Sequence, residues 1–271
     1  MEKHIKITVW VIQIIRSNLD LIHPQTYYIT KSGVLQSLRK PQDGTIRIGR
    51  ESIIDTNFVY NDIMLNTRNT LISRSHCLIN YQEFFRHAFP NVYLSFLMGS
   101  HSRLGQKSVL LTLPQTLFKY ILDFITEPKL PIIISPSSIT YLRIQSSTPV
   151  SLKLGMGILV GFALYFTVEV LEEFLCVLKS DNSGKCFYFT YEENKEYCLG
   201  NENMDMTDIS GEIIEKVQFR VKCRKQKWLI ADGQEGKPSR TGTWMRIGDT
   251  HEYLANKAEV KIGEFILKID W

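Results

Sequence analysis

Short apolar or alternating runs, separated by turn-forming residues, recur along most of the chain. Clusters of Pro, Gly, Asn and Asp indicate the turns, among them Pro41–Gly44, Asn182–Gly184 and Asp232–Gly233. The runs between turns are rich in β-branched or aromatic residues and include Thr45–Ile48, Cys77–Ile79, Phe187–Phe189, Phe219–Val221 and Phe265–Ile269. This pattern is typical of a mostly β chain of the sandwich type.

Two stretches have a helical pattern instead. Residues 115–124 carry apolar side chains at a spacing close to 3.6, and residues 168–178 do likewise, with Glu169, Glu172 and Glu173 grouped together. We therefore expect helical insertions near 115–124 and 168–178.

The length of 271 residues predicts two domains, at roughly 150 residues per domain. Ser146–Pro149 is the best candidate linker, and it lies near the middle of the chain. The expected domains are residues 1–147 and 150–271, and their similar size suggests an internal duplication.

Composition excludes several classes of protein. Hydrophobic residues make up 44% and charged residues 22%, which excludes disorder for most of the chain. A net charge of +4 is too small for wholesale wrapping of nucleic acid, so no nucleic-acid partner is expected. The five cysteines form no C-x-x-C pair, which points away from a zinc site and toward free thiols in a reducing compartment. The expected location is intracellular, cytoplasmic or nuclear.

Leu154–Val168 has fifteen residues without a charge and is the main candidate for membrane contact. A spanning helix needs about 20 apolar residues, and the glycines and aromatics here suit strand–turn–strand at least as well. Near the N-terminus, Lys6 and Gln13 interrupt the apolar run Ile5–Ile15, which favours a buried strand over a secretory signal. No membrane partner is expected, and a membrane-anchored alternative predicts co-sedimentation with membranes.

Three short motifs in the first half form the most specific pattern in the sequence. Ile48-Gly49-Arg50 ends a strand run, Asn61–Leu65 (NDIML) follows, and Ile72–Ile79 (ISRSHCLI) comes next. This order resembles the forkhead-associated (FHA) domain, a β-sandwich that binds phosphothreonine peptides. The resemblance implies two tandem FHA-like sandwiches, the first with an extended loop insertion.

The residue types in these motifs suit phosphate binding. Arg50 follows a rigid strand and is able to form two charge-assisted hydrogen bonds, while Ser73 offers a hydroxyl and Arg74 a second cation. At about 1.5–3 kcal/mol for each charge-assisted bond, a few such contacts reach roughly micromolar affinity. By the resemblance, Arg50 and Ser73 contact the phosphate, and Gly49 and His76 support the binding loop. Taken singly, the same residues also fit a solvated arginine, a turn hydroxyl and a core histidine.

One part of the family pattern is missing. FHA domains usually carry a Ser-x-Asn-Gly-Thr turn whose Asn bonds the peptide backbone, and the nearest match here, Gly99–Gly105, has no Asn. Ser102 and Arg103 are the candidates to replace it.

The second half repeats the plan with a changed site. Asn201 occupies the position of the arginine, Glu215 that of the serine and Gln218 that of the histidine, and a carboxylate there would repel phosphate. We expect this copy to pack against the first or to dock a partner without phosphate.

The sequence thus predicts an adaptor or scaffold that binds a phosphothreonine-containing protein through its first domain. The alternative is a phosphate-independent structural protein built from two worn FHA sandwiches. No catalytic residue, cofactor or metal ligand set is expected, because no motif for nucleotide, metal or nucleophilic chemistry is complete. Gly155–Gly161 has the wrong spacing for a dinucleotide fingerprint, and the basic run Lys222–Lys227 favours a solvated hairpin tip over a nucleic-acid contact.

Overall fold

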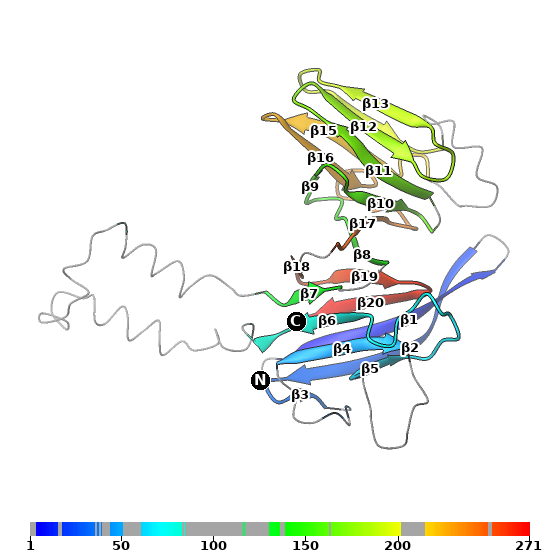
Figure 1. The fold of residues 1–271 in the computed structure, drawn as a ribbon, viewed down its shortest axis with the longest axis vertical. Coiled ribbons are helices and arrows are strands. Elements are labelled where there is room, and N and C mark those ends of the chain that lie inside the picture. The colour runs from blue at the N-terminus through cyan, green and yellow to red at the C-terminus, as the bar shows by residue number, and fades with distance from the viewer. Residues whose placement is uncertain are drawn as a thin grey trace, which may run out of the picture.

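The structure is a computed structural model that describes residues 4–15, 18–35, 37, 39, 44–50, 61–82, 84, 116, 130–135, 139–162, 164–201, 215–248 and 251–271. Its described part is mostly β and forms two lobes, one above the other in Figure 1. The first lobe contains β1 (Ile5–Ile15), β2 (Asn18–Thr30), β3 (Gly33–Val34), β4 (Thr45–Arg50), β5 (Ile63–Leu65), β6 (Cys77–Asn80), β7 (Ile132–Ile134), β8 (Thr140–Arg143), β18 (His251–Tyr253), β19 (Ala258–Ile262) and β20 (Phe265–Asp270). The second contains β9 (Val150–Ser151), β10 (Gly157–Val160), β11 (Leu164–Leu171), β12 (Leu175–Ser180), β13 (Cys186–Thr190), β14 (Glu196–Leu199), β15 (Phe219–Arg224), β16 (Lys227–Asp232) and β17 (Thr243–Arg246).

One long sheet runs through both lobes. Its eleven strands have the order β13-β12-β11-β10-β17-β8-β19-β20-β1-β2-β3, and β8 and β17 are the neighbours that join the lobes. A five-stranded sheet, β18-β7-β6-β4-β5, completes the first lobe, and a four-stranded sheet, β14-β15-β16-β9, completes the second.

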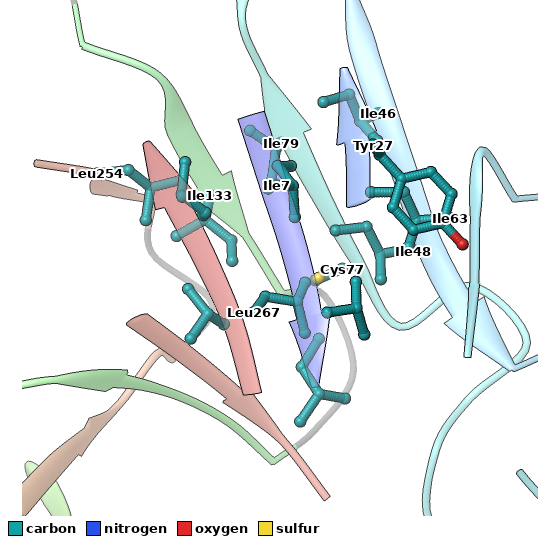
Figure 2. Packing of buried hydrophobic residues seen from close by; sticks show 14 of the residues in the cluster. Ile7, Tyr27, Ile46, Ile48, Ile63, Cys77, Ile79, Ile133, Leu254 and Leu267 are labelled. Atoms are coloured by element: carbon teal, nitrogen blue, oxygen red, sulfur yellow. The ribbon is translucent and has the colours of Figure 1, made fainter. Parts of the chain in front are cut away.

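Each lobe has its own apolar core. In the first lobe, Ile46, Ile48 and Ile79 of the five-stranded sheet pack with Ile7 and Leu267 of the long sheet, and all five are fully buried (Figure 2). The second core is more aromatic and includes Phe166, Phe189, Phe219 and Trp228. Alternate residues of β4 face the interior of the first lobe, as period-2 patterning requires for a sheet with one buried face.

The two lobes correspond strand by strand about the junction between β8 and β17. β8 reads Thr-Tyr-Leu-Arg and β17 reads Thr-Trp-Met-Arg. In their antiparallel register Leu142 lies opposite Met245, its own equivalent. On either side of this pair, an aromatic residue of one strand lies opposite the arginine of the other. The backbone bonds beyond the strands match too, because Ile144 N–H donates to the Thr243 carbonyl and Ile247 N–H to the Thr140 carbonyl.

Strand pairing crosses the boundary expected between residues 147 and 150. The hairpin β10–β11 pairs with β17 and β12, whereas the matching hairpin β19–β20 pairs with β8 and β1. The pairs that cross the boundary are β8 with β17, β8 with β19, β1 with β20 and β7 with β18, whereas β9 pairs with β16 within the second half. The last twenty-one residues, 251–271, therefore lie in the lobe built by the N-terminal half, and the middle of the chain forms the other lobe.

The helix expected at 168–178 is wrong. Residues 164–171 and 175–180 form β11 and β12, an antiparallel hairpin. A register shift between Val168 and Val170 interrupts the alternation of the strand, so the apolar positions imitate a helical spacing. The helix expected at 115–124 lies outside the described residues, apart from Thr116.

Two other sequence interpretations are confirmed. Leu154–Val168 contains β10, a turn and the start of β11, and no helix in the described part of the chain has the length and apolar character needed to cross a membrane. The basic run Lys222–Lys227 forms the end of the β15–β16 hairpin, and its two turn residues, Lys225 and Gln226, adopt positive φ values of 49° and 62°.

Candidate functional site

The end of β4 meets the loop before β6. Arg50 N–H donates to the Ser73 carbonyl at 3.0 Å, and His76 N–H donates to the Ile48 carbonyl at 2.8 Å. Gly49 lies so close to this loop that a Cβ there would be 2.0 Å from the Arg74 carbonyl oxygen. The structure thus brings together Gly49, Arg50, Ser73 and Arg74.

Asn61 ties the two segments together. Its buried side-chain amide donates to the Arg74 carbonyl at 2.5 Å and to the Arg50 carbonyl at 3.3 Å. Sequence reasoning did not assign this role to Asn61. The signal was a short polar residue just before the start of β5, separated from Ile63 only by Asp62, where side-chain bonds to backbone are common.

Asp62, the next residue, anchors β4 and β5 to each other. Its fully buried carboxylate pairs with Arg39 at 2.7 Å and accepts hydrogen bonds from the Ser37 hydroxyl at 2.5 Å and the Arg47 amide at 2.9 Å. This paired and hydrogen-bonded charge holds the strand that ends in Arg50 against the rest of the lobe.

His76 braces the loop from the interior. Its Nδ1 accepts the Ser73 N–H at 3.1 Å, which requires the neutral imidazole. Burial lowers the pKa of His76 from its ordinary value, and the Ile139 backbone offsets part of this effect. Because its ring is 1% exposed and engaged with the loop backbone, His76 is placed to position Ser73.

The two arginines of this region differ in exposure. The Arg50 Nε is buried and has no hydrogen-bond partner among the described residues, and Arg74 is exposed. Neither arginine forms an ion pair within the described part of the chain. Ser73 is half-buried, and the backbone bonds bring the segments that carry Arg50, Ser73 and Arg74 together at the end of β4. Ser102 and Arg103 lie outside the described residues.

The second lobe repeats this backbone arrangement. Asn201 N–H donates to the Glu215 carbonyl at 3.0 Å, and Gln218 N–H donates to the Leu199 carbonyl at 2.7 Å. Gln218 Oε1 accepts the Glu215 N–H at 3.3 Å, as His76 Nδ1 accepts the Ser73 N–H. A Cβ on Gly200 would lie 2.2 Å from the Lys216 carbonyl, in the same way as at Gly49.

The chemistry of the second arrangement is nevertheless different. The Glu215 carboxylate accepts the Arg240 N–H at 2.9 Å and lies 3.4 Å from the Arg240 side chain. The Glu215 carboxylate is therefore already bound to the side chain and the backbone N–H of Arg240, and Asn201 carries no charge.

The described residues contain no group of three side chains suited to holding a metal ion. Comparison of the chain with protein-family models, with curated proteins and with solved structures finds no match.

Proposed function

We propose that this protein is an adaptor that binds a phosphothreonine-containing partner through Arg50, Ser73 and Arg74. The proposal is supported by the backbone hydrogen bond from Arg50 N–H to the Ser73 carbonyl, together with a buried Arg50 Nε that has no hydrogen-bond partner among the described residues. A buried donor without an acceptor costs about 1–3 kcal/mol, and an anion bound at this place would remove that cost.

A phosphate group suits this site better than a carboxylate. Phosphothreonine carries close to two negative charges and three acceptor oxygens, enough to engage both arginines and the serine together. The residues are held by Gly49, Asn61 and His76, so little ordering is needed when the ligand binds. Because the unphosphorylated threonine lacks the charge, binding would depend on a kinase acting on the partner.

The test is a titration with an oriented phosphothreonine peptide library, beside the same library without phosphate. We expect phosphate-selective binding by the wild type and its loss in Arg50→Ala, with the unfolding midpoint unchanged. Asn201→Ala, at the matching position of the second lobe, is the control and should bind as the wild type does. Equal, weak capture by all three proteins would overturn the proposal.

The geometry of the second lobe favours a second candidate, a scaffold that acts without phosphate. There the matching place is filled by Glu215 and Arg240 of the chain itself. Phosphate-dependent binding should weaken steeply as ionic strength rises, whereas an apolar scaffold contact should not. Partner binding that persists at high salt and in Arg50→Ala would favour the scaffold.

A further inference from the structure

The correspondence between the lobes allows their outer edges to be compared residue by residue. β2 follows β1 at one end of the long sheet, as β13 follows β12 at the other. Ile29 pairs with Ile5, and Phe189 pairs with Cys176 in the matching register. Tyr27–Thr30 (YYIT) therefore corresponds to Phe187–Thr190 (FYFT). Ile29 and Phe189 are both buried, while Tyr28 and Tyr188 are both exposed.

In the first lobe, the chain itself covers this edge. β3 adds to β2 as an antiparallel strand, with Gly33 opposite Thr30 and Val34 opposite Ile29. Leu35 N–H then donates to the Tyr28 carbonyl at 3.0 Å. Val34 is 3% exposed and belongs to the core, so the short strand supplies both backbone pairing and an aliphatic side chain.

In the second lobe, no strand of the described part of the chain pairs with the matching edge, where β13 is the last strand of the long sheet (Figure 1). The Tyr197 hydroxyl bonds both backbone groups of Thr190. It accepts a hydrogen bond from the N–H at 3.2 Å and donates one to the carbonyl at 2.7 Å. In an antiparallel ladder the outward-facing residues alternate, so Tyr188 also turns its N–H and carbonyl away from β12. An exposed edge of this kind is a template for another strand.

A groove lies beside this edge. It has a volume of about 530 Å³ and is lined by Cys186–Phe189 of β13 and Glu196–Leu199 of β14. Apart from Glu196, its lining is uncharged, and Glu196 is already paired with Arg220 at 3.1 Å and Lys222 at 3.3 Å. The groove therefore offers apolar and backbone contacts but no unpaired charge.

We propose that this edge binds an extended, uncharged peptide of a partner protein, which adds to β13 as an antiparallel strand. While Thr190 keeps its bonds to Tyr197, the peptide takes the place that Val34 and Leu35 have in the first lobe. Its amide donates to the Tyr188 carbonyl, as Leu35 does to Tyr28, and a β-branched aliphatic side chain enters the groove, as Val34 enters the first core. This second docking site is independent of phosphate.

The probe is a fluorescently labelled peptide with the sequence of residues 32–38, which contains the β3 segment. We expect saturable binding followed by fluorescence anisotropy. Tyr188→Pro removes the outward N–H without touching the ladder to β12, and should weaken binding at least about tenfold. Tyr188→Ala keeps the backbone donor and is the matched control, expected to stay within about threefold of the wild type.

The same point is tested from the ligand side, without altering the protein. A probe methylated on the amide nitrogen that corresponds to Leu35 should lose binding, because it has no donor for the Tyr188 carbonyl. Equal affinity of both probes, or of the wild type and Tyr188→Pro, would overturn the proposal.

Binding that appears only after deletion of residues 202–214 would assign the edge to the chain itself, and self-association abolished by Tyr188→Pro would assign it to a second copy. Either result would overturn a partner peptide as the occupant. Arg50→Ala should bind this probe with the affinity of the wild type, so this test does not depend on whether the first lobe binds phosphate.

Discussion

Gly49→Ala is the most informative single change at the candidate site. The added Cβ would be 2.0 Å from the Arg74 carbonyl oxygen, so that oxygen must retreat by at least 1.0 Å to reach the 3.0 Å limit of real contacts. The 2.5 Å bond from Asn61 to the same oxygen would then break. Overpacking costs about 1–3 kcal/mol and a lost hydrogen bond about 1 kcal/mol, so the free energy of unfolding should fall by about 2–4 kcal/mol.

The loop that moves also carries Ser73 and Arg74, so phosphopeptide affinity should fall at least about tenfold. Gly200→Ala is the matched control, since its Cβ would lie 2.2 Å from the Lys216 carbonyl in the second lobe. We expect a comparable loss of stability there and unchanged phosphopeptide binding. Urea unfolding followed by tryptophan fluorescence measures the first quantity, and fluorescence anisotropy with a phosphothreonine peptide measures the second. A change below about 0.5 kcal/mol in Gly49→Ala would refute the packing argument. Equal loss of binding in both variants would refute the link between this loop and phosphate.

Two further predictions concern the residues that hold the site. Asp62→Asn removes the charge that faces Arg39 inside the lobe, and should lower the free energy of unfolding by about 3–5 kcal/mol; a loss under about 1 kcal/mol in urea unfolding would count against this anchor. Burial lowers the pKa of His76, so the unfolded chain takes up this proton at a higher pH than the folded protein does. Its contribution to stability is therefore complete above the ordinary pKa of 6.5 and is lost as pH falls through the folded pKa. His76→Gln, which introduces the residue found at position 218 of the second lobe, should keep the loop bond and reduce this acid sensitivity, measured as the difference in urea midpoint between pH 7.5 and about 5.5; an identical pH dependence in both proteins would contradict the assignment.

Local features of the fold and of the site followed from the sequence. Alternation and turn residues predicted strands such as Thr45–Ile48, because strand patterning depends only on neighbouring residues. The resemblance of the motifs to an FHA domain implied that Gly49, Arg50, Ser73 and His76 lie together, and their backbones do meet at the end of β4. The helix expected at 168–178 failed because a single irregular pair in a hairpin changes the apparent period.

The amino-acid sequence by itself thus determined where several strands form and which residues of the second half replace those of the first. The tertiary structure alone decided which strands pair. The hairpins β10–β11 and β19–β20 have similar patterns, and backbone hydrogen bonds are the same for any sequence, so either hairpin would fit either lobe by local rules. The choice rests on pairings between distant segments, such as β8 with β17 and β1 with β20, and on how well the side chains of each core pack. The tertiary structure alone likewise shows that β13 is an edge strand, because this depends on the order of the strands in the sheet.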